Sequence, residues 1–174
     1  MMGQKTDPRG FRLGVITESQ STNFADFKGG HFARVLQEDT AIRNYLSKKL
    51  KNAGLSHVRI SRKPGQVQVN VVTARPGLVL GKANEGIDLL RRDITSLLLV
   101  DDLNVQVNVF EVNKIDLDAT LIAQSVAEQL ERRIAFRRAM KQVIQRSMRA
   151  GAKGIKVIVS GRLGGADIAR SEKA

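Results

Sequence analysis

The chain has 174 residues, enough for one large domain or two small ones, and its hydrophobic content of 42% is ordinary for a folded protein. Its 29 Lys and Arg residues against 17 Asp and Glu residues give a net charge of +12, which indicates a polyanionic partner such as a nucleic acid. Because it has no Cys and no long apolar run, disulfides, thiolate metal sites and a membrane span are excluded.

The first 16 residues have the composition of an extended basic arm. Pro8, Gly10 and Gly14 interrupt any regular element. The basic residues among them are Lys5, Arg9 and Arg12. We expect the arm, residues 1–16, to become ordered on a partner.

Residues 17–112 are predicted to form the first domain. Residues 15–38 are polar and weakly patterned, so its first helix is expected to begin near Asp39 or Thr40. Apolar residues then recur at helical spacing, and Gly54 ends the helix.

Two strands, 55–62 and 66–73, follow as a hairpin in which hydrophobic and polar residues alternate. A short apolar segment at 78–80, a helix over about 84–98 and a strand at 104–112 complete the domain. This order of elements resembles a type II KH domain, in which helices back a three-stranded sheet. The fold class is therefore α+β.

A glycine turn, Gly81-Lys82-Ala83-Asn84, precedes the second helix and resembles the GXXG loop by which KH domains hold a nucleic-acid backbone. Asn84 stands in place of the second glycine. Asn tolerates the left-handed backbone conformation, but its side chain occupies space where a phosphate would approach. We interpret the turn mainly as a fold marker, with at most a modest phosphate contact through Lys82. In the alternative, glycine serves only the geometry of the helix N-terminus.

Residues 113–174 are predicted to form a second, two-layer α/β domain. Asp116 is the candidate N-cap of its first helix, a second helix spans about 135–150, and a strand covers 155–160. One strand cannot make a sheet. Either the strand borrows partners from elsewhere or more chain is missing, and we expect this domain to be incomplete at its C-terminal end.

The positive charge is concentrated in this second domain. Twelve of the 29 basic residues but only two of the 17 acidic residues lie from Arg132 onward, which leaves +10 there and +2 in the first 131 residues. No acid lies between Glu131 and Asp167, so the polar face of the second helix is predicted to carry uncompensated charge. A polyphosphate partner explains such a face better than simple solvation. Because the chain has no Trp and one Tyr, we expect phosphate and sugar contacts rather than base stacking.

No catalytic or metal constellation is apparent. His31 and His57 lie in different predicted elements, and Asp116 and Asp118 lie at element ends, where capping explains them. The glycine-rich segment around Arg162 matches neither the Walker nor the dinucleotide pattern, which favours a turn that brings this arginine to RNA. We expect no enzymatic activity, no cofactor and no metal. A metal-dependent nuclease would need a carboxylate cluster that the sequence does not show.

Several longer motifs point to one family. In chain order they are GQKTDP (3–8), GFRLG (10–14), TARPG (73–77), QLERR (129–133), FRRAMK (136–141), GAKGIK (151–156), SGRLGG (160–165) and IAR (168–170). In these motifs and their order the chain resembles bacterial-type small-subunit ribosomal protein three over nearly its whole length.

The resemblance implies a KH domain followed by an α/β domain, placed in the head of the small ribosomal subunit. It implies binding to small-subunit rRNA, a surface on the channel by which mRNA enters, and small-subunit proteins ten and fourteen as neighbours, with no membrane partner. The positions that match residues contacting mRNA and helping to open its structure are Arg137, Arg138 and Lys141. The expected rRNA-binding residues are Lys5, Arg9, Arg12, Arg132, Arg133, Arg146, Arg149, Lys153, Lys156, Arg162 and Arg170.

Two departures from the family stand out. Asn84 replaces a loop glycine, and the sequence given stops at Ala174, where relatives continue, so a truncated second domain is expected. Cytoplasmic ribosomes of bacteria and ribosomes of an organelle both fit as the location. The alternative function is a free KH-type RNA-binding factor that is not stably part of the ribosome.

Overall fold

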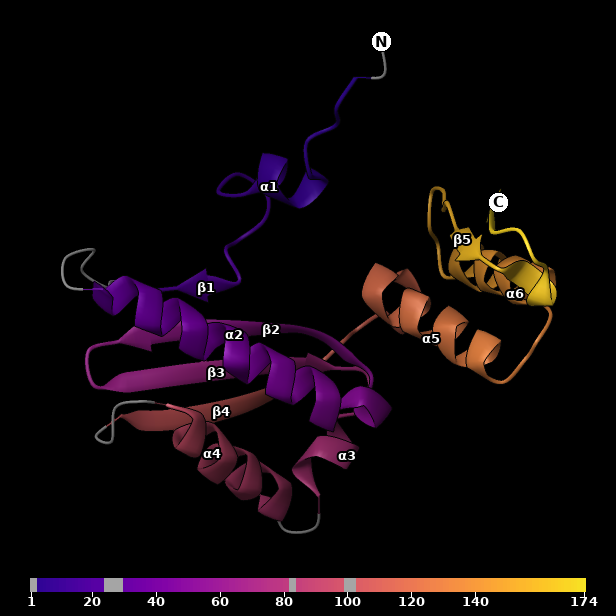
Figure 1. Ribbon diagram of the computed structural model, residues 1–174. Helices are drawn as coiled ribbons and strands as arrows, with labels where there is room; N and C mark the ends of the chain where they lie inside the picture. The colour runs from indigo at the N-terminus through magenta and orange to yellow at the C-terminus, as the bar shows by residue number, and fades with distance from the viewer. Residues whose placement is uncertain (1–2, 24–29, 82–83, 99–102) are drawn as a thin grey trace. The chain divides into compact units, whose positions relative to one another are not determined.

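The computed structural model describes residues 3–23, 30–81, 84–98 and 103–174. The chain divides into two compact units, Met1–Phe110 and Glu111–Ala174, each with its own hydrophobic core. Figure 1 shows the elements of both units. Among the described residues, no helix combines the length and apolarity needed to cross a bilayer.

The first unit is an α+β fold with a four-stranded sheet in the order β1-β2-β3-β4. Its elements are α1 (Pro8–Arg12), β1 (Ser21–Thr22), α2 (His31–Lys49), η2 (Lys51–Ala53), β2 (Leu55–Lys63), β3 (Gln66–Thr73), α3 (Pro76–Leu80), α4 (Glu85–Leu97) and β4 (Asn104–Glu111). Helices α2 and α4 cover the same face of the sheet (Figure 1). The predicted order of a type II KH domain is confirmed from α2 to β4.

Alternation along the strands builds the core of this unit. β2 and β3 pair antiparallel, with Val58 opposite Val71, and Gly65 has a left-handed φ of 74° in the turn between them. Every second residue of β3 from Val67 onward is buried. The three valines among them pack with Ile42 and other apolar residues of the helices.

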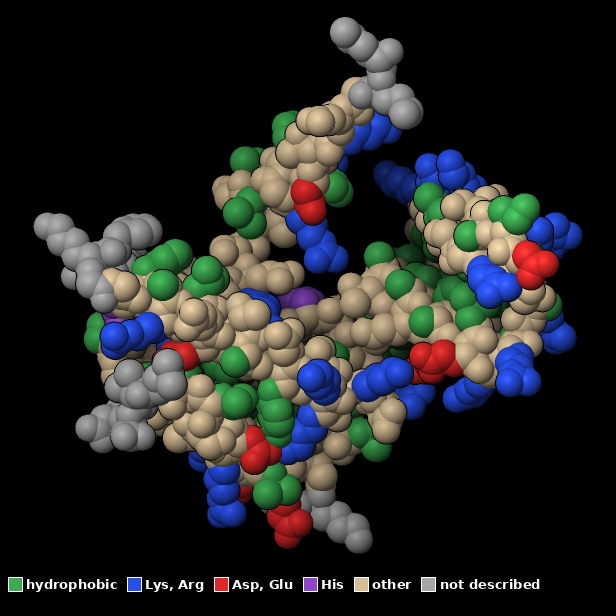
Figure 2. Space-filling model, viewed as in Figure 1, with side chains coloured by type: hydrophobic (Ala, Val, Ile, Leu, Met, Phe, Trp, Pro, Cys, Tyr) green, Lys and Arg blue, Asp and Glu red, His purple; other side chains and the backbone are tan. Residues whose placement is uncertain are grey.

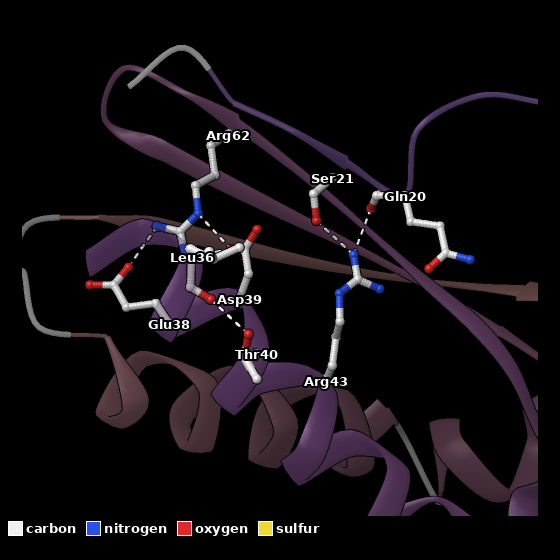
Figure 3. Close-up of polar contacts among 8 residues, drawn as sticks. All are labelled: Gln20, Ser21, Leu36, Glu38, Asp39, Thr40, Arg43 and Arg62. Atoms are coloured by element: carbon white, nitrogen blue, oxygen red, sulfur yellow. Dashed lines mark hydrogen bonds and ion pairs between the residues drawn. The ribbon is translucent and has the colours of Figure 1, made fainter. Parts of the chain in front are cut away.

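Helix α2 begins at His31, about two turns earlier than the sequence predicted. Two positions on its buried face are acidic, Glu38 and Asp39, so the hydrophobic pattern fails there. Arg62 on β2 compensates both carboxylates, with its Nη1 2.7 Å from Glu38 Oε2 and its Nε 2.9 Å from Asp39 Oδ1 (Figure 3). The N-cap is Gly30, which has no side chain to signal a helix start.

Strand β1 is a fourth strand that the sequence analysis missed. It is two residues long and pairs parallel with β2. Arg43 of α2 fixes the start of β1 and the residue before it. One of its guanidinium nitrogens donates to Gln20 O at 2.8 Å and to Ser21 Oγ at 2.7 Å (Figure 3). Burial lowers the pKa of the Arg43 guanidinium below its ordinary value.

The second unit consists of two helices and a small sheet. Its elements are η4 (Ile115–Leu117), α5 (Ala119–Glu131), α6 (Phe136–Arg149), β5 (Ile158–Gly161), η5 (Leu163–Gly165) and β6 (Arg170–Lys173). The N-cap of α5 is Asp118, whose Oδ1 accepts from the backbone N–H groups of Thr120 and Leu121. The prediction that Asp116 caps this helix was wrong, because a 3₁₀ turn occupies residues 115–117.

The prediction of a single strand was also wrong. β5 pairs antiparallel with β6, from Ile158 opposite Lys173 to Gly161 opposite Arg170. Val157 and Ala174 add one further pair through two backbone hydrogen bonds. Regular pairing of β5 begins three residues later than expected. The preceding apolar residues still pack against the core formed by Val126, Met140, Val143, Val159 and Leu163.

Candidate nucleic-acid interface

Helix α6 is strongly amphipathic, and this fixes which side chains face outward. Ala139, Met140, Val143 and Ser147 recur at helical spacing and are buried. The basic residues of the helix lie outside this stripe and are all exposed, and they are Arg137, Arg138, Lys141, Arg146 and Arg149. Packing of the apolar stripe therefore presents the cations to the solvent.

Five side chains of α6 line a shallow, open surface hollow of about 520 Å³, which we call the α6 hollow. They are Arg137, Arg138, Lys141, Gln142 and Gln145. The structure thus brings together around one surface depression the three cations that the sequence analysis assigned to mRNA contact. Lys and Arg side chains are numerous over the unit that contains α5 and α6 (Figure 2).

The backbone adds to the positive potential at this end of α6. The N-cap residue is Ala135, which offers no side-chain hydrogen bond, and the first turn contains no acidic residue. The first N–H groups of a helix carry a partial positive charge, and acids normally offset it. Here Arg137 and Arg138 lie in that first turn instead, so the side-chain charges and the partial charge of the helix N-terminus are both positive.

The expectation of wholly uncompensated charge was wrong for part of the surface. Arg146 Nη2 lies 2.6 Å from Asp116 Oδ1, a residue that precedes the basic region in the sequence. Glu172 contacts both Arg137, at 3.2 Å, and Arg170, at 3.6 Å. In a fourth pair, Arg162 Nη2 and Asp167 Oδ1 are 3.2 Å apart. Lys141 and Arg138 have no acidic partner in the part of the chain that the structure describes.

The remaining candidates of the second unit lie outside the α6 hollow. Arg132 and Arg133 are exposed between α5 and α6, and Arg133 has a left-handed φ of 59°. Lys153 and Lys156 are exposed in the segment between α6 and β5. Arg162 is held in its turn by a 2.9 Å hydrogen bond from Nε to Ala166 O.

The N-terminal arm is partly helical rather than extended. Asp7 caps α1 by accepting from the N–H groups of Arg9 and Gly10. The predicted cations of the arm are exposed. So are four large apolar residues to which the sequence analysis gave no role, namely Phe11 at 76%, Leu13 at 52%, Val15 at 87% and Ile16 at 80%. Scattered over a short polar arm, they gave no periodic signal.

Of the glycine turn, the structure describes the two end residues, and Asn84 adopts the left-handed conformation that its residue type tolerates. Gly81 has φ 68° and ψ −168°, and Asn84 is left-handed with φ 64°. Lys82 and Ala83 lie outside the described residues. Gly86 is the residue that sequence reasoning missed: a Cβ there would lie 2.2 Å from Val79 O. A lone glycine near a helix start gives no hint of such a close approach.

Within the described ranges, no three His, Asp or Glu side chains cluster in a way that could hold a metal ion. His31 begins α2, and His57 lies on β2 with its Nδ1 2.9 Å from Ser56 Oγ.

Comparisons with known proteins match both units. A family described as "KH domain" matches residues 41–117, and one described as "Ribosomal protein S3, C-terminal domain" matches residues 126–174. The chain is 50% identical to "Small ribosomal subunit protein uS3" of Synechococcus sp., 52% to that of Gloeothece citriformis and 52% to that of Lactobacillus helveticus. Each alignment covers 98% of this chain, and they cover 69%, 70% and 74% of these relatives.

Proposed function

Because the chain belongs to the family of small ribosomal subunit protein uS3, we propose that its α6 hollow faces the mRNA that enters the small subunit. Membership makes the chain a bacterial-type, RNA-binding component of the small subunit of the cytoplasmic ribosome, with a structural rather than an enzymatic role. The match across both units favours this function over a free KH-type factor.

The grouping of Arg137, Arg138 and Lys141 around one hollow is the observation that carries the proposal. Arginine presents a planar fork of donors to phosphate oxygens, and lysine adds a mobile point charge. Gln142 and Gln145 complete the lining with neutral donors and acceptors. The hollow is thus suited to a sugar-phosphate backbone of any sequence, as an mRNA channel requires.

The exposed charges of α6 suit an mRNA strand that slides over the surface better than one that is bound tightly. The three cations are exposed, so each phosphate contact is screened by salt and individually weak. A row of weak contacts can be exchanged one at a time as the strand moves. Contacts with a strand that has already separated would oppose its re-pairing, and this would help a base-paired segment to open at the surface.

The other cations of the arm and of the second unit that the sequence assigns to rRNA are proposed to bind it. They lie in four places, namely the N-terminal arm, the α5–α6 connection, the C-terminal half of α6 and the segment after α6. We assign the arm to residues 1–16, the KH domain to 17–112 and the α/β domain to 113–174. Small-subunit proteins ten and fourteen are the proposed protein neighbours. The turn at Gly81 contributes to the fold, with at most a modest phosphate contact.

Ribosomes that carry Ala at positions 137, 138 and 141 test the proposal. Small subunits should still assemble, because the three side chains are exposed and contribute little to the core. Translation through a stable mRNA hairpin should slow, while translation of an unstructured message should change little. A matched control replaces Arg34, Lys48 and Arg92, exposed cations of α2 and α4, with Ala. Unchanged speed through the hairpin would contradict the proposal.

A further inference from the structure

Glu172 lies between two arginines of the second unit. Its Oε1 accepts a hydrogen bond from Arg137 Nη2 at 3.2 Å and lies 3.6 Å from Arg170 Nε. Pairing of β5 with β6 places it there, opposite Val159. The Glu172 side chain is 29% exposed, whereas that of Arg137 is 72% exposed. A half-buried carboxylate is thus fixed beside one cation of the α6 hollow.

We propose that Glu172 is an intramolecular competitor for Arg137, which keeps the contact of this arginine with RNA weak and readily exchanged. Carboxylate and phosphate are both oxyanions that fit the same guanidinium fork. A phosphate that approaches Arg137 must therefore displace or share Glu172, whose charge also repels it. This inference rests on the proposed function, because it requires RNA at the α6 hollow.

Among the three cations of the hollow, only Arg137 is paired with an acid in the described part of the chain. Lys141 and Arg138 lack an acidic partner among the described residues, so a phosphate meets no competitor there. Arg137, Glu172 and Arg170 together have a formal charge of +1 rather than +2. The hollow therefore combines two stronger cationic contacts with one that the protein itself weakens. Because the three contacts differ in strength, a moving strand can release them one after another.

The ion pair is exposed at its arginine end, which limits the size of the effect. Exposed pairs of this kind change equilibria by about fivefold or less. A competitor of that strength weakens an RNA contact without abolishing it. Glu172→Gln removes the charge while keeping the shape and the carbonyl acceptor of the side chain, so it isolates the competition from the packing of β6.

Binding of the full 174-residue chain to a labelled single-stranded oligouridylate over a range of salt concentrations tests the inference. Glu172→Gln should bind about two- to fivefold more tightly at low salt. The slope of log affinity against log salt should steepen by about 0.7, the value of one added phosphate contact on a single strand. Glu172→Asp keeps the competing charge and should bind within about twofold of the unmodified chain.

Asp116→Asn is the matched control. It releases Arg146, which does not line the hollow, and changes the net charge by the same amount. Its gain in affinity should be smaller than that of Glu172→Gln. In a chain with Arg137→Ala, the gain from Glu172→Gln should fall to the level of this control.

Equal gains from Glu172→Gln and Asp116→Asn, or a gain that persists without Arg137, would overturn the inference. Arg138→Ala and Lys141→Ala separate this result from the proposed function. If these two variants weaken binding while Glu172→Gln equals its control, only the competitor role fails. If neither variant weakens binding, the proposed function fails as well.

Discussion

Arg62 of β2 and Asp39 of α2 form an ion pair inside the first unit, with 2.9 Å between Nε and Oδ1. The two side chains are only 10% and 5% exposed, and the same guanidinium also contacts Glu38. A buried carboxylate without a cation is strongly destabilised, so the helix and the strand depend on one another here.

Replacing Arg62 with Met should lower the free energy of unfolding of the first unit by about 3 kcal/mol or more, because it removes from two buried carboxylates the cation that contacts both. Tyr45 is the single Tyr of the chain and packs against the first core, so its fluorescence in urea reports on this unit. Arg59→Met on the same strand removes an exposed pair with Glu18 and should cost less than about 1 kcal/mol. Equal losses of unfolding free energy in the two variants would contradict the claim that burial makes the Arg62 ion pair important.

The contact of Asp93 with Lys49 and Tyr45 should make stability fall in acid. Hydrogen bonds from Lys49 and then Tyr45 lower the pKa of Asp93 below its ordinary value of 3.8. The unfolded chain then takes up the proton more readily, so the stabilisation is complete above pH 3.8 and is lost as the pH falls through the folded pKa.

Urea unfolding followed by circular dichroism at several pH values checks this dependence. Asp93→Asn should flatten the decline of stability in acid. Asp88→Asn should leave the decline unchanged, because its partner Arg91 is 3.8 Å away and both side chains are more than half exposed. An acid decline of the same steepness in both variants would show that Asp93 does not carry the effect.

Gly86→Ala should destabilise the first unit by about 2 kcal/mol or more, because the new Cβ would overlap backbone oxygens of Val79 and Leu80. Gly77→Ala is the control within α3. It meets no other described atom within 4 Å and should raise stability by about 0.5 kcal/mol. Thermal unfolding measures both, and tolerance of Ala at position 86 would contradict the close packing of α3 and α4.

Arg138→Glu should separate the stability of α6 from its function. An acid in the first turn favours the helix dipole and should stabilise α6 by about 0.3–1 kcal/mol. RNA binding should nevertheless weaken by about fivefold or more, because a hollow cation becomes an anion. Amide hydrogen exchange of α6 measures the first effect. Arg149→Glu, at the C-terminal end of the helix, should instead give faster exchange, because an acid there opposes the helix dipole.

Much of the fold follows from local patterns in the sequence. The strands that begin at Leu55 and Gln66 alternate hydrophobic and polar residues, and α6 shows a clear apolar stripe. The predicted ends of these three elements therefore lie within one residue of the observed ends. The first turns of α2 were missed because acids occupy the buried face and only Arg62, distant in sequence, explains them. β1 is too short to have a pattern.

The candidate site was predicted in its charges but not in their pairing. Helical spacing alone places Arg137, Arg138 and Lys141 on one face of α6, as the structure confirms. That Glu172 reaches Arg137 depends on β6, a strand that the sequence analysis did not predict. Long-range contacts of this kind are set by tertiary packing, which no local pattern encodes.

Crosslinking from a photoreactive amino acid at position 141 tests the central claim most directly. In assembled small subunits with bound mRNA, the account predicts crosslinks from this position to mRNA downstream of the decoding site, whereas the same group at position 153 should crosslink to rRNA. Crosslinks from position 141 to rRNA alone would contradict the claim that the α6 hollow faces incoming mRNA.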